Sequence, residues 1–370
     1  MNNSSDAQSL VVIHILNKRG ALGGIEMLLQ TVLEDTKELK LEHRTIFIAD
    51  TSLSRLLFRR HVFRVIVLFW GLVRVALITF LNRFNHKRVS LIFHSSEAHF
   101  LAYLLAAITK LSKNIKIVNY LHQSPNLYPR KLRKYIFFQL AKGVPSISYS
   151  SLIRSAWDIP IEETNAIVIH AIPRQIRGPE SGNMQPAKNG INFLFVGRDV
   201  FWKRLDFAID FSLKIKLEGI PVSLYVIGGR ADELNVRWAD KCRDLEIHFL
   251  GQQESINYAS YDFLLVPCDY EDSREIIGIA GFESILQKTP ILVRDLKFTD
   301  FSQFPGVYSF DKVLQLIKVT PVKEDAISLL KSFRLTDFEL AEFWDQTLSR
   351  SRYIEQFETF MITLHQQSTC

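Results

Sequence analysis

The chain has 370 residues, more than a single hydrophobic core usually serves, so two domains of ordinary size are expected. Its hydrophobic content of 47% agrees with a fully folded protein. The 45 Lys and Arg residues only slightly outnumber the 39 Asp and Glu residues, which favours phosphate-bearing ligands or an anionic membrane surface and argues against nucleic acid as a partner.

The cysteines and the first residues bear on the compartment. Cys242, Cys268 and Cys370 have neither the spacing of a zinc site nor that of a secreted disulfide framework, so we expect a reducing compartment and a cytoplasmic protein. Residues 1–9 are polar and lead into Leu10–Leu16, which lacks the basic flank and cleavage site of a signal peptide. We therefore expect the first strand there.

One segment requires that a membrane be considered. His61–Leu81 is almost wholly apolar, but Arg64 and Arg74 interrupt it. Because an arginine near the centre of a spanning helix costs about 2.5 to 3.5 kcal/mol on insertion scales, a transmembrane helix is not expected. Two interpretations stay open: a helix lying peripherally on the inner face of the plasma membrane, or a long helix packed on a sheet. In the first, the lipid-facing side chains are Arg55, Arg59, Arg60, Arg64, Phe63, Leu68, Phe69 and Trp70.

Short β-rich runs alternate with helical stretches in the first half of the chain, which predicts a parallel sheet. The predicted strands are Leu10–Leu16, His43–Ala49, Val89–His94, Ile115–His122, Ser146–Ser150 and Ala166–Ile172. Pro173–Gly190 then contains three Pro and three Gly, as is typical of a linker. We predict a first domain over 1–172 and a linker over 173–190.

A second alternating series follows and predicts another doubly wound α/β domain over 191–349. Its strands are expected at Ile191–Val196, Val222–Ile227, Glu246–Leu250, Asp262–Val266 and Pro290–Val293, with an amphipathic segment at Leu205–Leu217. A C-terminal helix at about 350–370 is expected to pack back on the first domain. Since open α/β sheets bind ligands at the carboxyl ends of their strands, two such domains facing each other predict a cleft that holds the chemistry.

The first candidate site follows the strand Ile191–Val196. Gly197 ends the strand, and Arg198 and Lys203 follow, five positions apart, before a helix. Such a loop suits a diphosphate, which the guanidinium contacts in bidentate fashion and the ammonium contacts as a point charge. Two solvated loop cations remain the alternative.

The second candidate site combines two carboxylates and glycines at a helix start. Glu275 and Glu283 are separated by seven residues, with Gly278 between them and Pro290 beyond. Exposed amides at a helix start receive phosphate oxygens, and carboxylates accept hydrogen bonds from sugar hydroxyls. An ordinary helix with a charged cap remains the alternative.

A glycine-rich turn forms the third candidate site. Gly20–Glu26 follows the first strand directly and precedes an apolar helix. Glycine permits a close approach of backbone to ligand. The turn lacks the G-x-G-x-x-G spacing of a dinucleotide site, which argues against a dehydrogenase.

In order and placement these motifs resemble those of the retaining glycosyltransferases of group one, a family related to glycosyltransferase family 4. The resemblance implies the GT-B fold, an α/β architecture of two Rossmann-like doubly wound domains facing across a cleft. It is clearest over Ile191–Val293. The positions that carry it are Gly23, Gly24 and Glu26, then Gly197, Arg198 and Lys203, then Glu275, Gly278, Glu283 and Pro290.

The resemblance also implies roles. Arg198 and Lys203 would stabilise the donor diphosphate as it leaves, a task that other enzymes give to a metal, so neither a metal nor a cofactor is expected. Glu283 would hold the ribose, and Glu275 the transferred sugar, with Glu271 as a rival for that position. The other implied site residues are His122, facing the donor sugar, and Gly23, Gly24, Gly197, Ile277, Gly278 and Ile279 around the phosphates.

The expected activity is transfer of a sugar from a nucleotide-diphosphate sugar, with retention, to an acceptor. The expected acceptor is a glycan or a glycolipid intermediate of bacterial cell-surface glycan synthesis, such as lipopolysaccharide. Two alternatives stay open: a nucleotide-sugar epimerase or hydrolase on the same scaffold, and a non-catalytic protein that binds nucleotide sugars. Arg204 stands where the family often has glycine.

Overall fold

The computed structural model divides the chain into two compact units. The first unit comprises residues 1–170 and 350–370, and the second comprises residues 171–349. The predicted linker lies mostly outside the residues that the structure describes. These are residues 10–18, 41–49, 61–84, 88–94, 114–122, 144–148, 150–159, 165–169, 189–253, 255–268, 277–294, 304–345 and 349–366.

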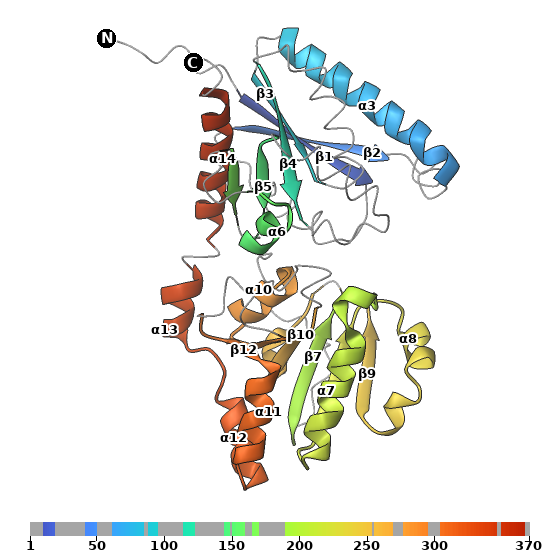
Figure 1. Cartoon of the computed structure of the whole chain (residues 1–370), viewed down its shortest axis with the longest axis vertical. Helices are drawn as coiled ribbons and strands as arrows, with labels where there is room; N and C mark the ends of the chain where they lie inside the picture. Colours follow the sequence, from blue (N-terminus) through green and yellow to red (C-terminus); the bar gives the residue numbers. More distant parts are fainter. Residues whose placement is uncertain are drawn as a thin grey trace. The chain divides into compact units, whose positions relative to one another are not determined.

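The first unit contains a six-stranded sheet in the order β2-β1-β3-β4-β5-β6, in which every neighbouring pair is parallel (Figure 1). Its strands are β1 (Leu10–Lys18), β2 (Glu42–Ala49), β3 (Arg88–Phe93), β4 (Ile115–Leu121), β5 (Ser146–Ser148) and β6 (Ala166–Val168). The six strands predicted for this half are thus confirmed, with ends that differ by a few residues.

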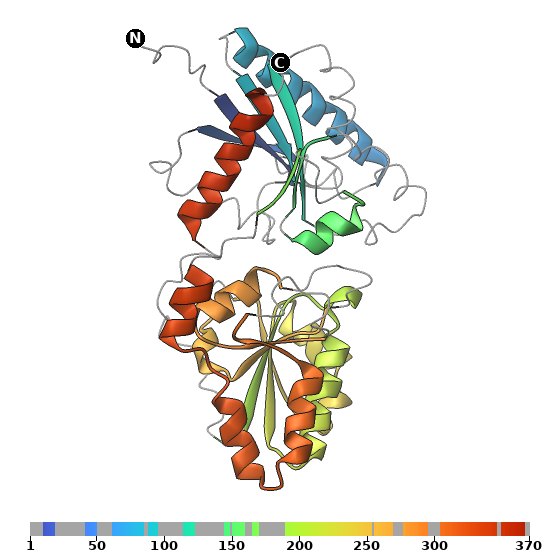
Figure 2. The ribbon, with the colours of Figure 1, turned by 60° about the vertical axis from the view of Figure 1, so that its left-hand side comes forward.

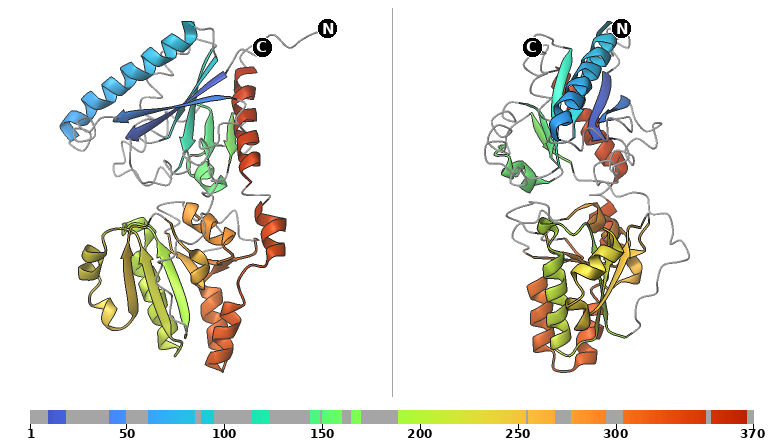
Figure 3. Two further views of the ribbon diagram at one scale, coloured as in Figure 1. Left: turned by 180° about the vertical axis from the view of Figure 1, so that it is seen from behind. Right: turned by 90° about the vertical axis from the view of Figure 1, so that its right-hand side faces the viewer.

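The two faces of this sheet differ in chemistry. Side chains alternate along a strand, so Val11 and Ile13 enter the apolar core beneath helix α3 (His61–Phe84). His14 points to the opposite face, where its ring stacks on Phe357 of helix α14 (Arg350–Gln366). The views in Figures 2 and 3 show α3 and α14 on opposite sides of the sheet. The face beneath α14 therefore buries histidine side chains beside its apolar ones, while Val11 and Ile13 pack into an apolar core beneath α3.

Helix α3 packs on the sheet through one stripe. Val67, Gly71, Val75 and Thr79 are buried and recur every four residues, as expected for one face of a helix. The packed-helix interpretation is therefore confirmed for this stripe. Large apolar side chains remain exposed elsewhere on α3, namely Phe69, Trp70, Leu77, Phe80 and Leu81. Among the described helices, none combines the length and apolar character needed to span a bilayer.

The second unit contains a six-stranded sheet in the order β12-β11-β10-β7-β8-β9, again with every pair parallel. Its strands are β7 (Ile191–Val196), β8 (Val222–Ile227), β9 (Glu246–Gly251), β10 (Phe263–Val266), β11 (Ile291–Val293) and β12 (Val307–Ser309). Five of these were predicted. The edge strand β12 was missed because three residues carry too little alternation to be recognised.

Helices cover both faces of the second sheet. Helix α7 (Leu205–Leu217) has the bounds of the predicted amphipathic segment and packs Phe211 between Phe193 of the sheet and Phe310 of α11 (Phe310–Val319). Helix α10 (Ile279–Leu286) lies on the other face, where Gly281 approaches Ile291. The helical segments are α7, α8 (Ala231–Arg237), α10 (Ile279–Leu286), α11 (Phe310–Val319), α12 (Lys323–Lys331), α13 (Asp337–Glu339), η2 (Phe201–Lys203), η3 (Lys241–Arg243), η4 (Tyr258–Ser260) and η6 (Leu340–Asp345); α6 (Ser151–Ala156) belongs to the first unit.

Candidate functional site

The strand order of the second unit identifies the edge at which a ligand is expected. Strands β7 and β10 are neighbours in the sheet, and the chain leaves them toward opposite sides. Open α/β sheets bind ligands at this reversal of strand order, outside the carboxyl ends of the strands. Gly197 follows β7 directly, and the segment after β10 leads to Gly278. Two of the predicted motifs thus come from the two strands that flank the reversal.

Glycines bring the backbone of this edge close together. The Gly197 amide donates to the Ile227 carbonyl over 2.9 Å, and the Gly228 amide donates to the Gly251 carbonyl over 2.7 Å. Gly228 has φ of +126°, and a Cβ added to it would lie 2.2 Å from the Gly197 carbonyl oxygen. Only glycine fits position 228, so the loops after β7, β8 and β9 are held together by backbone contacts.

The structure brings Gly197 and Lys203 together. Lys203 ends the short helix η2, and its Cδ lies 3.7 Å from the position of a Cβ built on Gly197. The stem of the lysine therefore lies against the glycine. Arg198 is exposed on the same loop. Both cations belong to the segment that leaves β7, as the sequence predicts.

Asp199 anchors this loop, and the sequence analysis overlooked it. Its Oδ2 accepts hydrogen bonds from Arg237 Nη1 over 2.6 Å and from Trp238 Nε1 over 3.3 Å. These contacts join the Arg198 loop to the end of α8. The aspartate directly after Arg198 was the available signal, but its partners lie nearly forty residues further along the chain.

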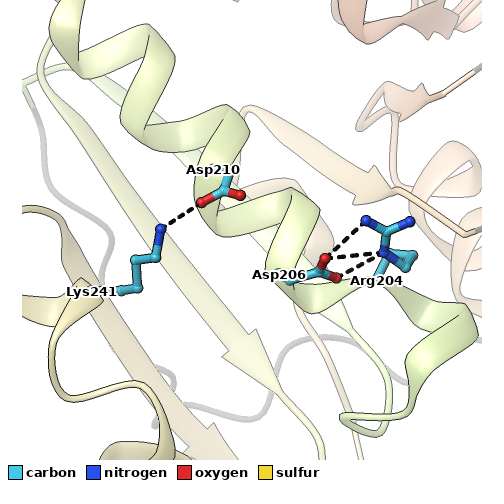
Figure 4. A network of polar contacts seen from close by, with 4 residues as sticks. All are labelled: Arg204, Asp206, Asp210 and Lys241. Carbon is cyan, nitrogen blue, oxygen red and sulfur yellow. Dashed lines mark hydrogen bonds and ion pairs between the residues drawn. The ribbon is translucent and has the colours of Figure 1, made fainter.

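Arg204 occupies a backbone position that favours glycine. Its φ and ψ are 54° and 50°, the left-handed region, in which most residues are strained. Its guanidinium binds Asp206 through hydrogen bonds of 2.9 and 3.1 Å from Nε and 2.9 Å from Nη2 (Figure 4). These bonds lower the pKa of the Asp206 carboxyl. Arg204 thus adopts the left-handed conformation while its side chain is bound to Asp206.

The second predicted motif lies at the start of α10. Gly278 is the N-cap, and no side chain caps the first turn within the described residues. Ile277 is buried, and Ile279 is half-buried. Glu283 is buried one turn further on, where its Oε2 accepts a hydrogen bond from the Tyr258 hydroxyl over 3.0 Å. Uncapped amides and a buried carboxylate are therefore present on one helix of eight residues.

Tyr258 was also overlooked. It lies in η4, 25 residues before Glu283, and no spacing rule connects the two. Tyr258 lies between β9 and β10 in the sequence, and only the tertiary fold brings its hydroxyl to α10.

His122 lies at the carboxyl edge of the first unit, directly after β4. Its Nε2 shares a hydrogen bond of 3.0 Å with His94 Nδ1, and its ring stacks on Tyr120 with centroids 4.3 Å apart. The remaining predicted site residues lie outside the described residues; these are Gly23, Gly24, Glu271 and Glu275. Within the described part of the chain, no group of three or more His, Cys, Asp or Glu side chains is arranged to hold a metal ion.

Solved structures match nearly the whole chain. Anabaena Alr3699/HepE, in complex with UDP and glucose, shares 13% identity with a TM-score of 0.64 over 95% of this chain and 99% of that one. The lipopolysaccharide outer core galactosyltransferase WaaB shares 14% identity with a TM-score of 0.57 over 95% and 99%. A putative UDP-N-acetylglucosamine 2-epimerase from Listeria monocytogenes shares 10% identity with a TM-score of 0.52 over 97% of each chain.

These similarities identify the fold. The chain is an α/β protein of the GT-B kind, so the predicted fold class is confirmed. The sequence itself matches no family model and no curated protein.

Proposed function

We propose that this chain is a glycosyltransferase that moves a sugar from a nucleotide-diphosphate sugar to an acceptor, with retention and without a metal ion. The observation that carries the proposal is the position of two motifs on the second unit. Arg198 and Lys203 follow β7, and Gly278 and Glu283 follow β10, at the reversal of strand order in a GT-B fold. A neighbour in fold, HepE, was crystallised with UDP and glucose.

The proposed chemistry depends on charge. When the bond to the anomeric carbon breaks, the nucleotide diphosphate leaves with negative charge, and Arg198 and Lys203 would stabilise it. Amides at the start of α10 would bind phosphate oxygens, since the helix dipole favours an anion there. Glu283 would accept hydrogen bonds from the ribose hydroxyls. Glu275 would hold the transferred sugar, and His122 would face it.

A panel of nucleotide sugars tests the proposal. A ligand that binds the folded chain raises its melting temperature according to its affinity, so thermal shift identifies the donor. With that donor and an acceptor-containing extract, Arg198→Ala should lower transfer by about 100-fold or more. Lys241→Ala is the matched control, because Lys241 is an exposed cation paired with Asp210 on α7 (Figure 4). Equal activity in Arg198→Ala and the control would contradict the proposal.

A second function is favoured by one observation. The structure of a putative UDP-N-acetylglucosamine 2-epimerase also matches the chain, so epimerisation or hydrolysis on this scaffold is the alternative. Epimerisation or hydrolysis would consume the donor with no acceptor present. Transfer requires the acceptor. A chain that binds the donor and consumes none, even with cell extract, would instead be a binding protein.

The acceptor is proposed to be a glycolipid at the inner face of the plasma membrane. Helix α3 exposes Phe69 and Trp70 together with Leu77 and Phe80 on the side away from its buried stripe. Arg74 is also exposed, although one of its N–H groups donates to the Phe47 carbonyl of β2 over 3.4 Å. An interfacial helix presents such apolar and aromatic side chains to the acyl chains and its cations to lipid phosphates. The chain would then be a peripheral membrane protein.

Flotation with anionic liposomes tests this contact. The wild-type chain should float, and Phe69→Ser with Trp70→Ser should reduce the floating fraction severalfold. Leu217→Ser is the matched control, because Leu217 is 86% exposed at the end of α7 in the second unit. If the wild type remains at the bottom of the gradient, the membrane contact is wrong, whereas donor binding is unaffected by that result.

A further inference from the structure

Four histidine side chains form a continuous row across the sheet of the first unit. His43 Nδ1 and His14 Nε2 share a hydrogen bond of 3.0 Å, and His14 Nδ1 shares one of 2.9 Å with His94 Nε2. His94 Nδ1 shares one of 3.0 Å with His122 Nε2. These residues belong to or directly follow β2, β1, β3 and β4, which are successive neighbours in the sheet.

The register of the strands explains the row. His43 is opposite Val12, so His14 is displaced by two residues toward the carboxyl end of the sheet. His14 is in turn opposite Ile92, which displaces His94 by two residues in the same direction. Residues two apart lie on one face of a strand, and diagonal neighbours across strands are within reach of aromatic side chains.

The row begins beneath a helix and ends at the ligand edge of the sheet. In the order β2-β1-β3-β4, the reversal lies between β1 and β3, and ligands bind outside the carboxyl ends there. His122 is at that edge. At the other end, helix α14 covers His43 and His14, whose ring centroids lie 5.7 and 5.9 Å from that of Phe357.

His14 and His43 are neutral near pH 7. Burial, with a contribution from His43, places the pKa of His14 well below its usual value, and burial lowers the pKa of His43 to about 4. A neutral imidazole carries one proton, so one nitrogen donates and the other accepts. Both nitrogens of His14 and both nitrogens of His94 are engaged with other rings. When all four rings are neutral, the proton position on His43 therefore fixes the position on each of the others.

Glu358 of α14 stands at the buried end of the row. Its Oε1 lies 3.8 Å from His43 Nε2 and also accepts a hydrogen bond from the Leu41 amide over 2.9 Å. His43 Nε2 is buried and has no hydrogen-bond partner among the described residues. A carboxylate oxygen attracts an N–H and repels a nitrogen lone pair, so Glu358 favours the proton on His43 Nε2.

We propose that Glu358 is a positioning residue, which acts through the histidine row to hold His122 as the tautomer protonated on Nε2. With the proton on His43 Nε2, His14 Nε2 donates to His43 Nδ1. His94 Nε2 then donates to His14 Nδ1, and His122 Nε2 donates to His94 Nδ1. This leaves His122 Nδ1 as an acceptor. That His122 Nδ1 accepts a hydrogen bond from a sugar hydroxyl rests on the proposed function, whereas the tautomer itself does not.

The tautomer is measured by nitrogen NMR of the full chain labelled with ¹⁵N-histidine, without any substrate. The signals of His122 are assigned from their loss in His122→Asn. In the wild type, Nε2 of His122 should give the signal of a protonated nitrogen and Nδ1 that of a bare nitrogen. A proton on Nδ1 in the wild type would overturn the proposal, whatever the behaviour of any variant.

A pair of variants on α14 tests the action of Glu358. Glu358→Gln removes the charge beside His43, so the ratio of the Nε2–H to the Nδ1–H tautomer of His122 should fall about tenfold or more. Glu355→Gln makes the same change at an exposed position of the same helix and should leave the ratio unchanged. Equal ratios in both folded variants would refute the coupling. Because no donor or acceptor is used, this failure is distinct from an absence of glycosyl transfer.

Discussion

The hydroxyl of Tyr258 donates a hydrogen bond of 3.0 Å to Oε2 of Glu283, and both side chains are buried. Tyr258→Phe removes this donor and leaves a buried carboxylate with one partner fewer, which should cost about 1 to 3 kcal/mol of unfolding free energy. If Glu283 binds the ribose, the nucleotide affinity should also fall about tenfold, because the carboxylate loses its orientation. Urea unfolding and calorimetric titration with the identified donor nucleotide measure the two effects.

Tyr308→Phe is the control for this prediction. Tyr308 is a half-buried tyrosine on β12, and removal of its hydroxyl leaves the Tyr258–Glu283 bond in place. Its nucleotide affinity should equal that of the wild type. If Tyr258→Phe loses stability but keeps its nucleotide affinity, Glu283 does not bind the nucleotide.

Gly281 supports the start of α10 by its lack of a side chain. A Cβ added there would lie 2.5 Å from Ile277 Cγ2. Gly281→Ala gains about 1 kcal/mol of helix propensity but should lose more, about 1 to 3 kcal/mol, through overpacking against Ile277. Displacement of Ile277 also moves Gly278, so thermal shift by the donor should decrease. The double variant with Ile277→Ala removes the clashing methyl and should bind better than Gly281→Ala alone; equal binding would contradict this explanation.

The strands could be predicted from the sequence because their apolar runs are short and regularly spaced. The predicted strand ranges even contained His14, His43, His94 and His122, one in each of four strands. Their association was not predicted, because it depends on the strand order β2-β1-β3-β4 and on a two-residue displacement at each step. Sequence spacing gives the face of a strand on which a residue lies, but not which strands are neighbours.

The site residues of the second unit show the same limit. Gly197 and Lys203 are near in sequence, so a local motif was sufficient to associate them. Asp199 and Tyr258 reach their partners only through tertiary packing, at separations that no motif records.

Arg204 offers a test of backbone strain. It adopts the left-handed conformation, which costs a residue with a Cβ about 1 to 2 kcal/mol and costs glycine little. Arg204→Gly relieves this strain and loses the partly exposed ion pair with Asp206, so its stability should lie within about 1 kcal/mol of the wild type. Arg204→Val keeps the strain, adds a β-branch and also loses the pair. In urea unfolding, Arg204→Val should be less stable than both the wild type and Arg204→Gly. If Arg204→Val is instead more stable than Arg204→Gly, the strain at position 204 is refuted.

His365 makes the first unit sensitive to acid. Its Nε2 shares a hydrogen bond of 3.0 Å with Ser90 Oγ, and burial, with Lys116 and Arg88 nearby, lowers its pKa to about 4. An unfolded histidine has a pKa of about 6.5, so between these values the unfolded chain binds a proton that the folded chain does not. The contribution of neutral His365 to the unfolding free energy is therefore fully present above pH 6.5 and is lost as the pH falls toward 4. Over this range the unfolding free energy should change by up to about 1.4 kcal/mol per pH unit.

His365→Gln removes this titration, so the urea midpoint of the first unit should depend less steeply on pH between 6.5 and 4.5. Trp157, buried in the first unit, reports the transition in a chain that keeps it as the sole tryptophan. Some slope should persist, because His43 also has a lowered pKa of about 4. His248→Gln changes a histidine of the second unit and should leave the slope at Trp157 as in the parent chain. An unchanged slope in His365→Gln would mean that His365 is already protonated in the folded state, and that its bond to Ser90 is made by the imidazolium.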